Sequence, residues 1–149
     1  LPPLAGRVLD LGCGWGAVGV SIKKKWPEID LVMTDVNQRA ADLSKSNLAL
    51  NGVSAEVLQG DGFENVAGTF DFVITNPPIR AGKQVIYGLF AQSAAALESD
   101  GEMYIVIRKQ QGAESAIKYL KTIFDQVETI DKSGGFWVIC CRGGQKDAV

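Results

Sequence analysis

Short apolar runs alternate with stretches of helical periodicity along nearly all of the 149 residues, and no linker or low-complexity segment separates them. Parallel strands need a crossover of a dozen or more residues between them, most often a helix. The alternation therefore predicts an α/β chain, doubly wound around one mostly parallel sheet of seven strands. We expect the strands at residues 7–11, 31–33, 55–59, 70–75, 103–107, 127–130 and 136–141.

The segments between these runs predict further details of the fold. The last two runs are separated by a tight turn at Ser133-Gly134-Gly135, which is too short for a parallel crossover. These runs should therefore pair antiparallel at one edge of the sheet. Asp100-Gly101 is expected to form a turn before the fifth strand. The helix that begins after Asn37 is expected to bury an apolar face made of Ala40, Leu43 and Leu50.

Composition narrows the possible functions. With 15 Lys+Arg against 17 Asp+Glu, the chain lacks the basic surplus of a general nucleic-acid binder. It has no histidine, which excludes Ser-His and Cys-His catalysis and imidazole metal sites, and we expect no bound metal. Its three cysteines have no CxxC spacing, which favours a reduced, cytoplasmic protein. The length suits a single domain over residues 1–149. Because the sequence starts at Leu1 rather than Met, we expect that the protein has an upstream segment that is missing from this sequence.

A glycine-rich segment, Asp10-Leu11-Gly12-Cys13-Gly14-Trp15-Gly16, joins the first strand to the first helix. Glycines at such a junction let the backbone approach a ligand, and the amides of the helix point outward. Residues 14–19 also match the G-x-G-x-x-G dinucleotide pattern, which alone is weak. Asp10 argues against that interpretation, because a carboxylate beneath the loop would repel a pyrophosphate and suits a cationic amino group.

Two more acids follow strands at the same expected edge of the sheet. Asp35 ends the second strand, where a carboxylate can accept both hydroxyls of a ribose, and Asp61 ends the third, where it can accept from an adenine amino group. Open α/β sheets bind their ligands at the carboxyl ends of parallel strands. The three acids and the glycine segment together predict a nucleoside-containing ligand with a cationic group.

The segment Asn76-Pro77-Pro78-Ile79 follows the fourth strand. Two prolines make it a stiff extended turn with free carbonyls. The Asn76 side-chain oxygen and the Pro77 carbonyl can each accept one proton of a planar amino group, which turns the nitrogen lone pair toward an electrophile. This pattern predicts group transfer to nitrogen. Four cations follow the fourth and fifth strands and are candidates for phosphate contacts: Arg80, Lys83, Arg108 and Lys109.

The glycine segment, the acids and the Asn-Pro-Pro turn together resemble class I S-adenosylmethionine-dependent methyltransferases that act on amino nitrogens. More narrowly, residues 7–142 resemble the "methyltransferase small" family, whose bacterial members include guanine-N2 methyltransferases of 16S ribosomal RNA. The resemblance implies a Rossmann-like catalytic domain, S-adenosylmethionine as cofactor with S-adenosylhomocysteine as product, and ribosomal RNA or a ribosomal subunit as partner, with no membrane.

The resemblance also implies roles for individual residues. Asn76, Pro77, Pro78 and Ile79 would hold the target amine. The implied cofactor contacts are Asp10, Gly12, Cys13, Gly14, Gly16, Asp35, Val36, Asp61, Gly62 and Asn76. One position departs from the family pattern, because many relatives carry Phe or Tyr after the second proline and this chain has Ile79. An aliphatic side chain gives up part of the roughly 1–3 kcal/mol attributed to aromatic stacking on a base.

Other functions stay open at this point. An Asn-Pro-Pro turn also suits a glutamine side-chain amide (N5) or adenine N6 in DNA, since each offers a planar amine. A non-catalytic cofactor-binding module that needs a partner subunit has the same glycine segment. A nicotinamide-dependent oxidoreductase is disfavoured by Asp10 and by the missing histidine proton donor.

Overall fold

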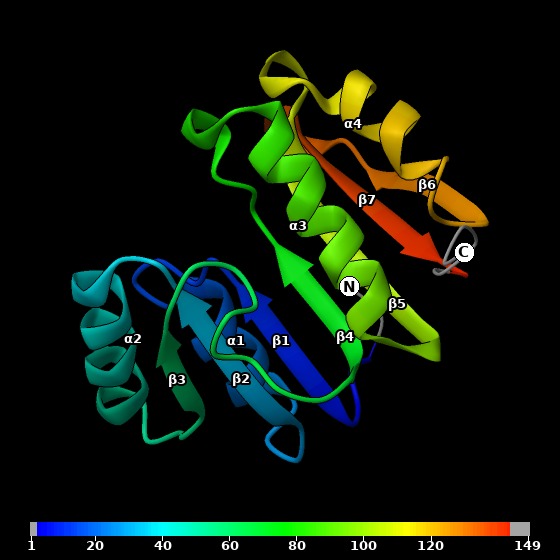
Figure 1. The fold of residues 1–149 in the computed structure, drawn as a ribbon. Coiled ribbons are helices and arrows are strands. Elements are labelled where there is room, and N and C mark those ends of the chain that lie inside the picture. The colour runs from blue at the N-terminus through cyan, green and yellow to red at the C-terminus, as the bar shows by residue number, and fades with distance from the viewer. Residues whose placement is uncertain (1–2, 144–149) are drawn as a thin grey trace. The chain divides into compact units, whose positions relative to one another are not determined.

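The computed structural model describes residues 3–143. Within this range the chain forms strands and helices in alternation, and the strand order is β3-β2-β1-β4-β5-β7-β6 (Figure 1). The α/β fold with a mostly parallel seven-stranded sheet and an antiparallel edge is confirmed. The elements are β1 (Arg7–Leu11), α1 (Ala17–Lys25), β2 (Asp30–Asp35), α2 (Gln38–Leu50), β3 (Glu56–Gln59), β4 (Phe70–Thr75), η1 (Ile79–Ala81), α3 (Lys83–Ala96), β5 (Leu97–Arg108), η2 (Lys109–Gln111), α4 (Ala113–Leu120), β6 (Gln126–Asp131), η3 (Ser133–Gly135) and β7 (Phe136–Arg142).

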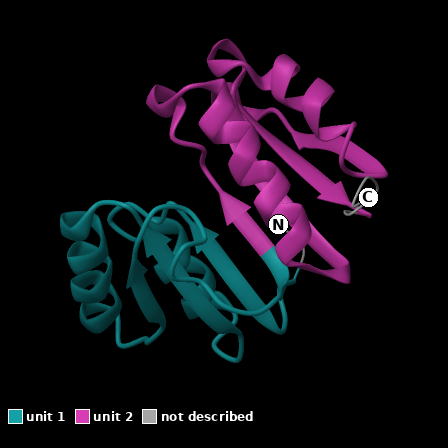
Figure 2. Ribbon diagram, viewed as in Figure 1, with its two compact units in different colours: residues 1–72 teal, residues 73–149 magenta. Residues whose placement is uncertain are grey.

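The chain divides into two compact units, Leu1–Phe72 and Val73–Val149, with the boundary inside β4 (Figure 2). In the first unit, β1 pairs parallel with β2, and β2 pairs parallel with β3. Val8, Leu9, Val32 and Met33 are all buried, so both faces of these strands are covered. Strands of this kind appear in a sequence as continuous apolar runs, which is why residues 7–11 and 31–33 were recognisable.

Arg7 ties the start of β1 to the segment that precedes β4. Its backbone N–H donates to Asp71 Oδ2 at 2.8 Å, and its guanidinium donates to the carbonyl oxygens of Ala67 and Thr69 at 2.8 and 3.2 Å. The guanidinium also lies over the Phe70 ring, 4.3 Å from its centroid. These contacts satisfy backbone acceptors of the connection between β3 and β4 and so hold this irregular segment against the strands.

The predicted inner face of α2 was wrong. The helix buries Ala41, Ser44 and Leu48, whereas the predicted Leu43 and Leu50 are 41% and 82% exposed. The buried stripe lies one residue further along the helix than the apolar pattern indicates. The small side chain of Ser44 lies against the glycine segment, because a Cβ on Gly16 would be only 3.1 Å from Ser44 Oγ. This close approach turns Ser44 rather than Leu43 inward.

In the second unit, β7 lies between β5 and β6 and is antiparallel to both. This confirms the predicted hairpin, whose turn contains η3. The β6–β7 ladder shifts register between Thr129 and Asp131. Adjacent Cys140 and Cys141 are both buried, because β7 is covered on both faces at this end.

The turn predicted at Asp100-Gly101 was wrong, because β5 starts directly after α3 and runs through both residues. Leu97 takes an extended conformation (φ −85°, ψ 144°) and is 3% exposed. Gly101 is buried, and its φ is not positive, so it is not used as a turn glycine. Burial of Leu97 at the start of the strand overrides the local turn preference of an Asp-Gly pair. Among residues 3–143 no helix combines the length and the apolar character that crossing a membrane requires.

Candidate functional site

The glycine segment between β1 and α1 is anchored to β2. The backbone N–H groups of Gly12 and Cys13 both donate to the Thr34 carbonyl oxygen at 2.9 Å. Gly16 needs to be glycine, because its φ is +96° and an added Cβ would lie 3.1 Å from Ser44 Oγ. A Cβ on Gly14 (φ +56°) would instead meet nothing within 4 Å. The segment is therefore packed at Gly16 and open at Gly14, where a ligand can approach the backbone.

Helix α1 begins directly after this segment and has no side-chain cap. Gly16 is its N-cap, and no side chain accepts a hydrogen bond there. The first turn of a helix leaves backbone N–H groups unpaired and carries a partial positive charge. The start of α1 can therefore receive an acceptor group of a bound ligand.

Asp35, at the end of β2, holds the open part of the glycine segment. Its Oδ2 accepts from the Gly14 N–H at 2.8 Å, and its Oδ1 accepts from the Asn37 N–H at 2.9 Å. A carboxylate has about four acceptor positions, so each oxygen keeps one for a ligand hydroxyl. Asp35 is half-buried. The structure thus gives Asp35 a positioning role in addition to the predicted role in ligand binding.

Asp10 lies in β1 and is 4% exposed. Its Oδ2 is buried without a hydrogen-bond partner among the residues that the structure describes, and the same holds for Thr34 Oγ1 in β2. Burial raises the pKa of Asp10 to about 7. A hydrogen bond from the Gly19 N–H lowers this pKa in part, and the negative charge of Asp35 raises it further. A buried, unsatisfied carboxylate oxygen is costly for a folded chain, which fits an acid that receives a cationic ligand group.

The remaining predicted residues of this unit surround the end of β2. Val36 is 63% exposed, and Asp61 is exposed. The Gly60 N–H donates to the Asp35 carbonyl oxygen at 2.9 Å, which brings the Asp61-Gly62 segment beside the end of β2. Cys13 is buried, and burial raises the pKa of its thiol to about 11, so the thiol stays neutral.

Two residues of α2 that sequence reasoning missed also hold the glycine segment. Ser44 Oγ donates to the Gly14 carbonyl oxygen at 2.8 Å, and Asn47 Nδ2 donates to the Trp15 carbonyl oxygen at 2.6 Å. Ser44 is fully buried. A polar residue on a buried helical stripe would have been a signal, but the stripe itself was placed one residue away.

In the second unit, Asn76 and Pro77 leave β4 with their acceptors unengaged. Asn76 is exposed, and neither its side-chain amide nor the Pro77 carbonyl oxygen makes a hydrogen bond within residues 3–143. The Pro78 carbonyl oxygen, in contrast, accepts from the Ala81 N–H at 2.8 Å, which starts η1. Peptide bonds in the described range are all trans. The turn therefore presents the two acceptors that the sequence predicted for a planar amine.

The four predicted phosphate-binding cations are all exposed, but they differ in their contacts. Lys109 Nζ lies 3.6 Å from Glu114 Oε1 in an exposed ion pair. The Arg108 guanidinium lies over the Phe136 ring, 4.3 Å from its centroid. Arg80 and Lys83 form no ion pair with any residue in the described range.

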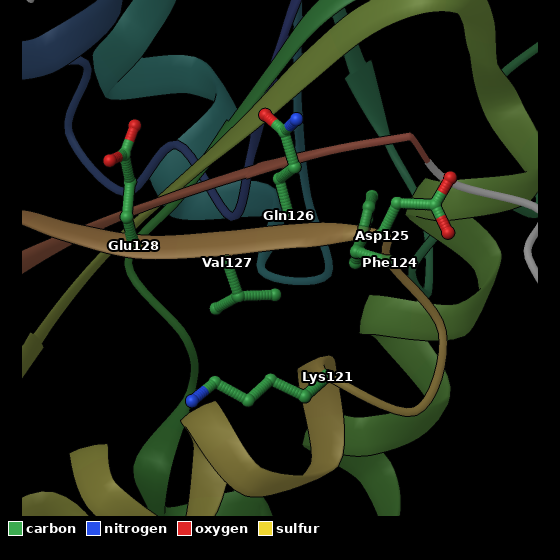
Figure 3. Close-up of a pocket in the computed structure, with 6 residues that line it drawn as sticks. All are labelled: Lys121, Phe124, Asp125, Gln126, Val127 and Glu128. Atoms are coloured by element: carbon green, nitrogen blue, oxygen red, sulfur yellow. The ribbon is translucent and has the colours of Figure 1, made fainter.

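Two surface cavities contain none of the predicted site residues. One, of about 500 Å³, is lined by residues from the end of α4 to β6: Lys121, Phe124, Asp125, Gln126, Val127 and Glu128. Figure 3 shows that Val127 points toward Lys121, whereas Gln126 and Glu128 point to the other side of the strand, so its polar groups do not converge. The other, of about 400 Å³, lies next to Trp26, before the amino end of β2. Residues 3–143 contain no group of three or more His, Cys, Asp or Glu that could hold a metal ion.

The first unit therefore contains a candidate binding site for a nucleoside that carries a cationic group. An open glycine backbone, an uncapped helix start, a half-buried acid with spare acceptors and a buried unsatisfied acid all meet at the ends of β1 and β2. These groups fit S-adenosylmethionine, which has a ribose, an adenine and an amino-acid ammonium group.

Comparison with known proteins agrees with this assignment. Residues 1–140 match the methyltransferase small domain family. The chain is 44% identical over 141 residues to Bacillus subtilis "Uncharacterized protein YbxB", covering 93% of this chain and 70% of that protein. It is 36% identical over 143 residues to "Ribosomal RNA small subunit methyltransferase C" of Vibrio parahaemolyticus, covering 91% of this chain and 40% of that enzyme.

Solved structures show the same fold at low sequence identity. A T. thermophilus 16S rRNA N2 methyltransferase (RsmC), in complex with AdoMet and guanosine, has a TM-score of 0.81 at 22% identity and covers 91% of this chain and 37% of its own. A ribosomal protein L11 methylase from Lactobacillus delbrueckii has a TM-score of 0.75 at 22% identity and covers 91% of this chain and 69% of its own. With its sequence match and its fold taken together, the chain belongs to the methyltransferase small family of S-adenosylmethionine-dependent methyltransferases.

Proposed function

We propose that residues 1–149 act as one cytoplasmic methyltransferase domain that transfers a methyl group from S-adenosylmethionine to the exocyclic N2 of a guanine in small-subunit ribosomal RNA. The observation that carries the proposal is the turn after β4, where the Asn76 amide and the Pro77 carbonyl are both unengaged. Relatives named for ribosomal RNA methylation support the choice of polymer.

The first unit would hold the cofactor. Asp35 would accept the ribose hydroxyls with the positions left by Gly14 and Asn37. The buried Asp10 carboxylate would attract the ammonium of the methionine part. Exposed Val36 would pack on the adenine ring, and Asp61 would accept from its amino group.

The second unit would hold the target amine. Asn76 Oδ1 and the Pro77 carbonyl oxygen would each accept one N–H of the amine, so that its lone pair points away from both acceptors. The bound cofactor supplies an already activated methyl group on a sulfonium. Asn76 and the Pro77 carbonyl would orient the amine nitrogen toward that methyl group, and the extra proton of the methylated amine would leave to water. Because no strong base is needed, the protein's contribution is alignment, which is worth roughly 7–11 kcal/mol of barrier.

The substrate surface around this turn is partly aliphatic. Ile79 is half-buried at the start of η1 and would cover one face of the target base. Arg80 and Lys83, which follow directly, would contact phosphates.

The Asn76→Ala variant tests the proposal. It should still bind S-adenosylmethionine in calorimetry, through the proposed contacts of the first unit, and lose roughly 99% of methyl transfer, because the amine is no longer aligned. Gln92→Ala, which truncates an exposed amide on α3, is the matched control and should keep full activity. Near-normal turnover by Asn76→Ala would contradict the clamp.

The substrate is tested with labelled cofactor and separate samples of 16S rRNA, 30S subunits, DNA and a glutamine-containing protein, followed by mass mapping of the product. Label on guanine N2 is the expected result. Label on adenine or on glutamine would contradict guanine N2 as the target and would show that the enzyme methylates another planar amine. Cofactor binding without transfer to any of these polymers would favour a module that needs a partner.

A further inference from the structure

A second exposed feature of Val73–Val149 lies where β5 ends and β7 begins. Because β7 is antiparallel to β5, Phe136 at its start pairs with Arg108 at the end of β5. Because β6 is antiparallel to β7, β6 also ends there, at Asp131. The turn between β6 and β7 is therefore at the carboxyl end of β5.

Two cation–aromatic pairs lie beside this turn. The Arg108 guanidinium lies 4.3 Å from the centroid of Phe136, and Lys132 Nζ lies 4.3 Å from the ring of Trp137. Both cations are exposed, and both rings are half-buried. Phe136 and Trp137 are consecutive strand residues and so project to opposite faces of the sheet. We call these four residues, Arg108, Lys132, Phe136 and Trp137, the turn platform.

The turn between the pairs is open. Gly134 and Gly135 have φ of +62° and +80°, and a Cβ added to either would meet nothing within 4 Å. Its shape is held by Asp131, whose Oδ1 accepts from the Ser133 N–H at 3.0 Å and from Ser133 Oγ at 2.6 Å. Neither Arg108 nor Lys132 forms an ion pair within residues 3–143. Two exposed charges and two partly exposed rings are thus available to a ligand.

The platform lies at the same end of this unit as the Asn-Pro-Pro turn. The connection from β4 through α3 to β5 is a helical crossover, which makes the two strands parallel, so both end at one edge. Figure 1 shows the β6–β7 turn and the segment between β4 and α3 at the same end of this unit.

We propose that the turn platform binds unpaired RNA nucleotides that flank the methylated one, one at each cation–ring pair; this rests on the proposed function, because it takes the substrate to be RNA. Proteins hold single-stranded RNA by stacking bases on aromatic rings and on arginine planes, with cations on the phosphates. The outer face of the Arg108 guanidinium is a stacking surface backed by Phe136. Lys132 can move from the Trp137 ring to a phosphate and leave the ring to a second base.

Charge and composition both favour such a local contact. The net charge of the chain is −2, so no general positive field draws RNA to it. Next to the platform, Glu114 offsets the charge of Lys109, which lies 3.6 Å from it. Stacking must therefore supply much of the affinity, and the platform supplies rings that Ile79 does not.

The test measures binding of a fluorescently labelled 12-nucleotide single-stranded RNA by anisotropy, at several salt concentrations and with S-adenosylmethionine present. Arg108→Lys keeps the charge and removes the plane, so it should weaken binding about tenfold without changing the salt dependence. Lys132→Ala should lower the slope of log affinity against log salt by about 0.7, the value for one phosphate contact on a single strand.

Lys25→Ala is the matched control, because Lys25 lies over the Trp26 ring at 4.9 Å in a pair outside the platform. It removes one charge from a similar pair and should leave RNA affinity unchanged. All variants change exposed side chains, and unfolding midpoints check that each remains folded.

The possible results distinguish a failure of the turn platform from a failure of the proposed function. Wild-type binding by Arg108→Lys together with an unchanged salt slope for Lys132→Ala would overturn the platform, while guanine methylation by the wild-type chain would stand. An equal loss in Lys25→Ala would show a nonspecific charge effect and would also overturn the platform. If the wild-type chain binds S-adenosylmethionine but no RNA, the proposed substrate and the platform both fail.

Discussion

Replacing Asp10 by asparagine removes a buried carboxyl group whose charge state depends on pH near neutrality. Burial raises the pKa of Asp10 from 3.8 to about 7 in the folded chain. Between these two pH values the unfolded chain has lost the proton and the folded chain keeps it, so the folded state binds more protons. The free energy of unfolding must then fall as pH rises from about 4 to about 7. At about 1.4 kcal/mol per pH unit, this difference in pKa corresponds to about 4 kcal/mol.

The measurement is urea unfolding of the wild-type chain and of Asp10→Asn from pH 4 to pH 8.5. The stability of Asp10→Asn relative to wild type should rise by about 4 kcal/mol across this range, because only the wild-type chain must bury a charge at high pH. The absolute stability of the variant also includes the cost of burying an amide, so the change with pH is the relevant quantity. Asp100→Asn, which changes an exposed carboxyl group in β5, is the control and should show no such trend.

Saturating S-adenosylmethionine should reduce this pH dependence. If the ammonium group of the cofactor contacts the Asp10 carboxylate, binding favours the charged form and releases a proton near pH 6.5. Cofactor affinity should then fall about tenfold for each pH unit below the pKa of about 7. Parallel pH–stability curves for the wild-type chain and Asp10→Asn would refute the reasoning about burial, and a pH-independent cofactor affinity would refute the contact.

Three more predictions concern the glycine segment and α2. Asp35→Ala should weaken S-adenosylmethionine binding at least tenfold in calorimetry, because it removes the acceptor of the Gly14 N–H as well as a ligand contact; unchanged affinity would contradict this. Gly16→Ala should cost about 1–3 kcal/mol in urea unfolding, since alanine at φ +96° is strained and its Cβ meets Ser44. Leu48→Ala should cost about 2–5 kcal/mol, whereas Leu50→Ala should stay within about 0.5 kcal/mol, because Leu48 is buried and Leu50 is 82% exposed. Equal losses in the two leucine variants would show that the position of the buried stripe is wrong.

The sequence predicted the fold class, the positions of the strands and the antiparallel hairpin, because the decisive signals are local, whereas the order of the strands came from the structure. The run at residues 7–11 became β1 with the expected bounds, and the run at residues 70–75 became β4. The glycine turn after β6 could only connect antiparallel strands, which fixed the edge of the sheet. The Asn-Pro-Pro turn kept its two acceptors unengaged because proline has no N–H to offer them and stiffens the chain locally.

What the sequence could not predict depends on contacts between distant segments. The rotation of α2 follows from the close packing of Ser44 on the glycine segment. The apolar pattern of Leu43 and Leu50 gave the wrong face, because a helix sequence does not specify which segment it will pack against. The Asp100-Gly101 pair became part of β5 once Leu97 was buried.

Residue identity and spacing by themselves determined the fold class, the family and the residues that present acceptors at strand ends. Tertiary structure alone decided which of those acceptors are already used: Asp35 is partly engaged by Gly14 and Asn37, whereas Asp10 is buried with one oxygen unsatisfied. The physical reason is that periodicity and turn chemistry act over a few neighbouring residues, while burial and hydrogen-bond partners arise only when segments far apart in the chain come into contact.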